Sequence, residues 1–253
     1  MSLHQSMIKS GHVLFRWRSY LPLLFIGPAL LALKQGAEWQ NLVGDDFQDI
    51  WVLCALAVSL IGLGVRIATV GFVPKATSGR NATGQRADSL NTTGMYSIVR
   101  NPIYLGNFII LIGVFLSVKV LWFAVIGSMF FMWYMERIIL AEEQFLHDKF
   151  GAEYDEWRAR TPVIIPDFKL WVKPALPFSL RTVLKREYPA LMAISAVYLI
   201  NEMVTDLVFE HDPFSFWIRH DFIFPAFFVA CVAIGLTLRF LKKKTKLLQV
   251  EGR

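Results

Sequence analysis

The sequence predicts an all-α integral membrane protein, a polytopic bundle of about six transmembrane helices with a polar face on the cytoplasmic side. Of 253 residues, 55% are hydrophobic and only 18% are charged, whereas a soluble domain has about 25% charged residues. The apolar residues collect in long runs separated by polar segments, as membrane-spanning helices require. The net charge is +6. The basic residues flank the apolar runs and form no separate basic domain, which argues against a nucleic-acid partner.

Six apolar runs are long enough, or nearly so, to cross a bilayer as helices. They cover residues 20–33, 51–73, 103–118, 120–135, 188–208 and 222–241. The first run is short, and its helix could begin near His12 with Arg16 and Arg18 at the membrane interface.

Only Lys119 separates the third run from the fourth. A single helix over 103–135 would be about 50 Å long, while the hydrocarbon core is about 30 Å thick. We therefore expect two antiparallel helices that reverse near 117–120, although neither Gly nor Pro marks the turn.

The loops predict the orientation. Lys and Arg concentrate in the N-terminal arm, in 74–100, in 137–186 and in the C-terminal tail, while the other loops carry acids. The positive-inside rule then places both termini in the cytoplasm. We expect the membrane to be a bacterial inner membrane. The glycosylation sequons at Asn81 and Asn91 would lie in a cytoplasmic loop, so we interpret them as chance matches.

Three parts of the chain are expected. Residues 1–73 supply the first two spans, 74–170 form a core with a polar loop, a helical hairpin and an amphipathic helix, and 171–253 form a second hairpin with a basic tail that binds anionic lipid. Cys54 and Cys231 lie in separate apolar runs and are expected to be small buried residues. No Cys/His spacing predicts a metal site.

The stretch VRNPIYLG opens the third run. Pro102 suits the first turn of a helix and keeps Asn101 out of the α region, which makes Asn101 the expected N-cap. Arg100 and Tyr104 would then flank a helix N-terminus, a position that attracts anions. The alternative is that they only anchor a helix end at the interface.

The pair Glu142-Glu143 follows the fourth run, whose helix is expected to continue as an amphipathic segment and to end at Gly151. Adjacent acids point about 100° apart, so one would face inward and the other water. Carboxylates near a helix C-terminus need an opposing cation. Arg100 or a cationic ligand would supply it, unless the pair simply forms a solvated face.

Arg66 lies late in the second run. An arginine there either extends to the interface or meets an anion, such as a lipid phosphate or carboxylate.

The blocks GMYSIVRNPIYLG, EEQFL, FGAEYDEW and TPVIIP closely resemble the isoprenylcysteine carboxyl methyltransferase and phospholipid methyltransferase superfamily. Its members carry a G-x-Y-x-x-x-R-H-P-x-Y-x-G block, a double-Glu helix and an F-G-x-x-Y-x-x-Y segment ending in prolines. The resemblance extends over about 77–166, and the order and spacing of the blocks together make it specific.

The resemblance implies an enzyme that takes S-adenosylmethionine from the cytosol and methylates a lipid or lipidated acceptor in the bilayer. Arg100 and Glu143 are implied to be catalytic, and Arg66 and Arg137 to contact the acceptor. The residues implied to line the cofactor site are Asp88, Leu90, Asn91, Tyr96, Asn101, Pro102, Tyr104 and Glu142.

Two positions depart from the family pattern. Asn101 stands where eukaryotic members have His, and an amide does not titrate near neutral pH, which argues against a general base there. Arg137 is out of register by one with the family's substrate-contacting Arg.

Three interpretations of the function remain. The basic residues favour O-methylation of an acidic group, which needs no base. N-methylation of an aminophospholipid would need a base such as Glu143, and S-methylation of a small thiol is a further alternative. A non-catalytic carrier or assembly factor is disfavoured, because no internal repeat is evident and the polar cluster lies at one face.

Overall fold

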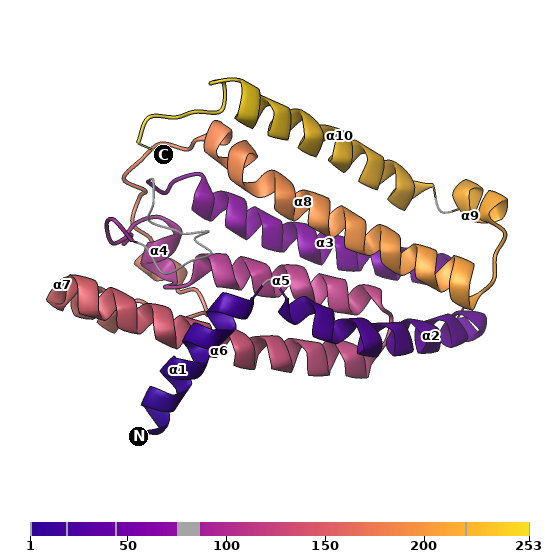
Figure 1. Ribbon diagram of the computed structural model, residues 1–253, viewed down its shortest axis with the longest axis horizontal. Coiled ribbons are helices and arrows are strands. Elements are labelled where there is room, and N and C mark those ends of the chain that lie inside the picture. The colour runs from indigo at the N-terminus through magenta and orange to yellow at the C-terminus, as the bar shows by residue number, and fades with distance from the viewer. Residues whose placement is uncertain (1, 19, 44, 75–86, 221, 253) are drawn as a thin grey trace.

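The computed structural model describes residues 2–18, 20–43, 45–74, 87–220 and 222–252, and within these ranges the regular structure is entirely helical. The helices α10, α8, α3, α5 and α6 lie side by side, and α1 crosses α6 at a steep angle (Figure 1). The element bounds are α1 Leu3–Trp17, η1 Leu21–Phe25, α2 Ile26–Val43, α3 Asp45–Val70, α4 Met95–Ile98, α5 Pro102–Ser117, α6 Leu121–Phe150, α7 Ala152–Arg160, η2 Phe168–Leu170, α8 Leu180–Met203, η3 Val204–Phe209, α9 Phe214–His220 and α10 Ile223–Lys244.

The helical membrane class is confirmed, but the count of six spans is not. In the described part of the chain, four segments have the length and composition to cross a bilayer: Asp49–Val70, Leu121–Phe150, Leu180–Phe209 and Ile223–Lys244. The apolar helix α5 is shorter than these. The first expected span falls in η1 and α2 and is not among the four.

A single helix beginning near His12 is a wrong prediction. The helix α1 ends at Trp17, and a separate 3₁₀ turn begins at Leu21. Pro22 stands in the first turn of that new helix, where its missing N–H leaves no hydrogen bond unmade.

The α5–α6 hairpin confirms the expected reversal. The amide of Lys119 donates to the Leu116 carbonyl (3.0 Å). Lys119 adopts a left-handed φ of 65°, so a residue other than glycine makes the turn. The helix α6 continues to Phe150, and Gly151 ends it with φ 52° and an amide donated to the His147 carbonyl at 2.8 Å. The continuation of the fourth helix is therefore confirmed.

Glycines set the distance between α3 and α5. A Cβ on Gly62 would lie 2.6 Å from the Gly106 carbonyl oxygen, and a Cβ on Gly106 would lie 2.6 Å from Cγ of Arg66. A Cβ on Gly113 would lie 2.5 Å from the Ala55 carbonyl oxygen. Small residues let helix backbones approach closely in membranes, so these three fix α5, and the loop that leads into it, against α3.

The C-terminal hairpin packs directly on α3. The hydroxyls of Ser59 and Tyr198 lie 3.0 Å apart, and Tyr198 stacks on Phe224 of α10 with ring centroids 6.3 Å apart. The helix α8 begins at Leu180, eight residues before the apolar run, and contains Pro189 within its length. Residues 171–253 therefore complete the core around α3.

Both cysteines are free thiols, but they differ in exposure. Cys231 is buried as expected, whereas Cys54 on α3 is exposed. The prediction of burial was wrong for Cys54, because the outward face of a membrane helix is apolar whether or not protein covers it.

Candidate functional site

The two polar segments singled out in the sequence meet at the end of the bundle where α4 and α7 lie (Figure 1). A guanidinium nitrogen of Arg100 lies 3.0 Å from a Glu143 carboxylate oxygen. The hydroxyl of Tyr104 donates to Oε1 of Glu142 at 2.9 Å. The VRNPIYLG block and the double-Glu helix are therefore in direct contact, and the cation expected opposite the acids is Arg100.

Local backbone geometry places Arg100. The short helix α4 ends at Val99, which is extended with φ −155°, and the Arg100 amide donates to the Pro162 carbonyl at 2.8 Å. Asn101 occupies the N-cap position of α5, as predicted, but its side chain does not cap the helix. It donates instead to the Val163 carbonyl at 3.2 Å.

The chain after α7 runs alongside this loop and holds it. The Asp167 amide donates to the Ile98 carbonyl (2.9 Å), and the Gly94 amide donates to the Val172 carbonyl (2.9 Å). The indole of Trp157 donates to the Tyr96 carbonyl at 3.0 Å. The FGAEYDEW and TPVIIP blocks therefore act as a brace for the first block.

Neither acid of the pair faces open water, so the expectation that one of them would is wrong. The Glu143 side chain is 18% exposed, and its partner Arg100 is 13% exposed. The reason is that α5 and its loop cover one side of α6, while α1 covers another through Gly11, whose Cα faces the Arg137 carbonyl.

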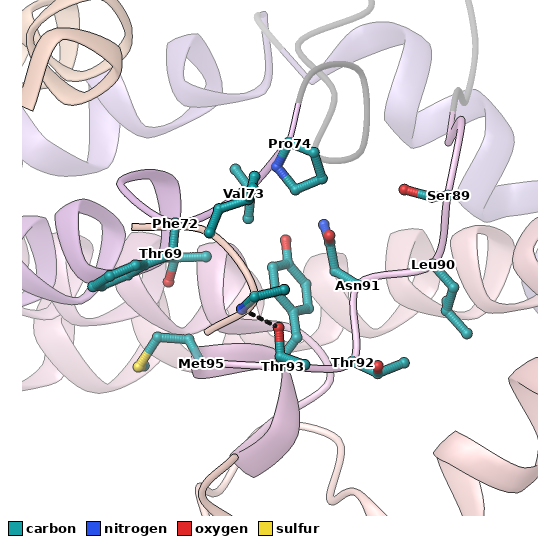
Figure 2. A pocket seen from close by; sticks show the side chains of 13 residues that line it. Thr69, Phe72, Val73, Pro74, Ser89, Leu90, Asn91, Thr92, Thr93 and Met95 are labelled. Atoms are coloured by element: carbon teal, nitrogen blue, oxygen red, sulfur yellow. Dashed lines mark hydrogen bonds between the residues drawn. The ribbon is translucent and has the colours of Figure 1, made fainter. Parts of the chain in front are cut away.

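A cavity of about 230 Å³ lies between the end of α3 and the loop before α4. Its lining includes Leu90, Asn91 and Tyr96, three of the predicted cofactor residues, together with Thr69 and Phe72. Figure 2 shows the Asn91 amide pointing toward Pro74. The amide nitrogen Nδ2 of Asn91 is buried and has no hydrogen-bond partner among the described residues.

The other predicted cofactor residues lie outside this lining. Asn101, Pro102, Tyr104 and Glu142 stand at the α5–α6 contact, and Asp88 is exposed in the loop. Tyr96 lines the cavity and also lies close to Glu142 at the α5–α6 contact. Burial raises the pKa of its hydroxyl, and the nearby Glu142 carboxylate adds to the rise.

Tyr154 is a site residue that the sequence did not single out by itself. It is wholly buried, and burial raises the pKa of its hydroxyl to about 12, with Glu143 adding to the rise and Arg100 opposing it. Within the described ranges, its hydroxyl and Nε of Arg100 are buried without a hydrogen bond. The signal in the sequence was the aromatic position of the FGAEYDEW block.

Arg66 meets an anion supplied by the protein. Its Nε and Nη2 donate to the two carboxylate oxygens of Glu187 at 2.8 and 3.0 Å, and Nη1 donates to Oδ1 of Asn107. Sequence analysis missed Glu187, an acid placed one residue before the fifth apolar run. Arg137 lies apart from this pair, with its guanidinium 5.6 Å from the Trp133 ring centroid.

Comparison with known proteins finds a family match in one segment of the chain. Residues 51–153 match the phospholipid methyltransferase family model. The chain is 30% identical over 147 residues to the nickel-cobalt-cadmium resistance protein NccN of Alcaligenes xylosoxydans xylosoxydans, covering 58% of this chain and 63% of the relative. It is 31% identical over 121 residues to the cobalt-zinc-cadmium resistance protein CzcN of Cupriavidus metallidurans, covering 48% and 54%.

The chain thus covers less than two thirds of the length of either curated relative. No solved structure matches it. The matched segment contains most of α3, the cavity loop, α4, α5 and α6, whereas Tyr154 and the bracing segment after α7 lie beyond it. Residues 51–153 therefore match the phospholipid methyltransferase family, which is part of the isoprenylcysteine carboxyl methyltransferase and phospholipid methyltransferase superfamily.

Proposed function

We propose that this chain transfers a methyl group from S-adenosylmethionine to a lipid or lipidated acceptor at the cytoplasmic membrane face. The observation that supports this most is the contact between the two motif blocks. Arg100 with Glu143 and Tyr104 with Glu142 form two adjacent polar pairs at one end of a helical bundle. Tyr96, which lies close to Glu142, lines a cavity together with Leu90 and Asn91.

The residues present fit the cofactor. The buried Nδ2 of Asn91 is a donor in need of an acceptor, and adenosine and carboxylate groups supply acceptors. Glu142 offers a carboxylate to a cationic ligand at the other side of Tyr96. When bound, the cofactor supplies an electrophilic methyl group on a sulfonium. The chain's part is to hold donor and acceptor in line and to exclude water, which strengthens each charge contact.

An acidic acceptor is our first proposal for the substrate class. Nε of Arg100 is buried and lacks a hydrogen bond in the described part of the chain, so an acceptor oxygen would satisfy it. A carboxylate or phosphate oxygen is already a nucleophile and needs no base. Glu143 then balances the Arg100 charge when no acceptor is bound. The acceptor-binding roles of Arg66 and Arg137 stay predictions.

N-methylation of an aminophospholipid is the second candidate, favoured by the family that matches residues 51–153. An amine must lose a proton before it attacks, so Glu143 would act as the base and would have to exchange Arg100 for the ammonium group.

The test is methyl transfer from labelled S-adenosylmethionine in membranes that contain the chain. The products are extracted into lipid, protein and volatile fractions. Label in the lipid fraction supports the proposal, and base lability of that label separates carboxyl esters from N-methyl products. Label in protein indicates a lipidated polypeptide, and volatile label indicates a small thiol. Absence of transfer together with absence of cofactor binding would overturn the proposal.

A further inference from the structure

The helix α1 lies outside the segment that matches the family, yet it reaches the site. We propose that Arg18, at the end of α1, binds the oxyanion group of the methyl acceptor and makes the enzyme selective for anionic lipids. This inference rests on the proposed function, since it assigns a substrate class to the same site.

The contact of α1 with α6 positions Arg18. Gly11 lies against the backbone of Arg137, and a Cβ there would lie 3.0 Å from Cβ of Ala141, the residue before Glu142. A side chain at position 11 would push the two helices apart. Figure 1 shows α1 crossing α6 near the end that carries the site.

Arg18 is held in a defined place. A guanidinium nitrogen donates to the Phe15 carbonyl at 3.1 Å, and the guanidinium lies 4.0 Å from the Phe15 ring centroid. From there it acts electrostatically on Glu142, Tyr104 and Tyr134. Tyr134 and Glu142 are eight residues apart and so share a face of α6. Arg18 therefore faces the same polar group that the two motif blocks build.

The charges favour an anion at this place. Glu142 is proposed to face the cofactor's cation, and a guanidinium beside the same carboxylate repels that cation. An oxyanion between Arg18 and the cofactor removes this repulsion, because it attracts both positive groups. Arg18 would then hold the acceptor next to the methyl donor, which Glu142 holds.

The surroundings of Arg18 suit a lipid. Trp17, Tyr20, Leu23 and Leu24 are all exposed, and the rings of Trp17 and Tyr20 lie 5.6 Å apart. Exposed aromatic and aliphatic side chains of this kind lie at the headgroup level of membranes. A lipid can therefore reach Arg18 sideways from the bilayer.

The test compares Arg18→Gln with Arg16→Gln in the full chain, reconstituted in phosphatidylcholine nanodiscs. Arg16 is on the same helix and is exposed, so it controls for general loss of positive charge. Association of spin-labelled phosphatidylglycerol is measured against spin-labelled phosphatidylethanolamine, and inorganic phosphate is added as a competitor. Cofactor affinity is measured in parallel. Arg18→Lys keeps the charge and serves as the conservative variant.

We expect Arg18→Gln to weaken phosphatidylglycerol association about tenfold, the loss of one charge-assisted hydrogen bond. Arg16→Gln and Arg18→Lys should change it little, and cofactor affinity should stay at or above the wild-type value. Competition by inorganic phosphate in the wild type but not in Arg18→Gln also supports the oxyanion site, with free phosphate as a second source.

Equal association in Arg18→Gln and Arg16→Gln overturns the proposal. Loss of cofactor affinity in folded Arg18→Gln also overturns it, because Arg18 would then belong to the cofactor site. If the wild type binds no cofactor at all, the proposed function fails, while the phosphatidylglycerol comparison still decides the role of Arg18.

Discussion

Glu142 and Glu143 are neighbours in sequence but have different partners, Tyr104 and Arg100. One carboxylate is thereby left with a neutral hydrogen-bond donor, while the other is paired with a cation. A cationic ligand can therefore approach Glu142 without displacing a hydrogen-bonded cation, whereas at Glu143 it would have to displace Arg100. This difference suits Glu142 to the cofactor and Glu143 to the acceptor side.

We predict that Glu142→Gln reduces S-adenosylmethionine affinity about tenfold or more, because a charged contact in a water-poor site is replaced by a neutral one. Glu136→Gln is the matched control, since Glu136 is an exposed acid on the same helix. Calorimetric titration of the purified variants measures both. Equal affinity in the two variants would remove Glu142 from the cofactor site.

Tyr154 gives a pH-dependent prediction. Because burial raises the pKa of its hydroxyl to about 12 from an ordinary 10.0, the unfolded state releases this proton first. The folded state should therefore lose stability as pH rises from about 10 to 12, and be unaffected below that range. The difference in thermal midpoint between wild type and Tyr154→Phe isolates this contribution. A difference that is constant from pH 8 to 12 would contradict it.

At this scale the sequence predicted a cation opposite the double-Glu pair, and Arg100 is that cation. The contact between Arg100 and Glu143 could be predicted because the α5–α6 hairpin brings the two motif blocks to the same end of the bundle. Glu187 and Arg18 could not, because each comes from a helix whose position depends on packing. Neither the rotation of α8 nor the crossing of α1 is encoded in local periodicity.

At the scale of elements, the α3–α5 contact depends on the absence of side chains. We predict that Gly106→Ala destabilises the protein by about 1–3 kcal/mol, because its Cβ would meet Arg66 and the Gly62 carbonyl. Gly64→Ala is the control on α3, where a Cβ meets nothing within 4 Å. That variant should be neutral or stabilising by about 1 kcal/mol, since alanine favours helix more than glycine does. Thermal unfolding in detergent compares the two, and equal midpoints would disprove the packing argument.

The elements themselves were predicted with uneven success. The α5–α6 reversal followed from bilayer thickness, and Lys119 makes the turn by adopting a conformation that few residues other than glycine adopt. The extension of the first span back to His12 failed because hydropathy does not register the break between α1 and η1. The start of α8 was missed because its first turns carry charged residues, one of which, Glu187, pairs with Arg66 of α3.

For the whole molecule, the Arg66–Glu187 pair joins the C-terminal hairpin to the domain that matches the family. We predict that Glu187→Ala costs about 3–5 kcal/mol, because it leaves a buried guanidinium without its anion. The double variant Arg66→Met, Glu187→Leu should recover most of that loss, since an apolar pair needs no compensating charge. Thermal midpoints of the three proteins test this, and a double variant no better than the single would contradict it.

The topology also belongs to this scale. The start of α1 and the segment after α10 lie at the same end of the bundle as the site (Figure 1). We predict that both termini face the cytoplasm, so that a fluorescent protein fused to either end is fluorescent and a periplasmic phosphatase fused to either end is inactive. An active phosphatase at one end would place the termini on opposite sides.

The short helix α5 has a consequence for the membrane itself. Its 16 residues span about 24 Å at about 1.5 Å per residue, against a hydrocarbon core of about 30 Å. Such a mismatch thins the adjacent bilayer. Headgroups near the site would then sit deeper than elsewhere. A polar acceptor would thereby come closer to Arg100 and Asn101, which directly precede α5. Turnover should accordingly be faster in bilayers of short acyl chains than of long ones, so that membrane thickness itself sets the activity.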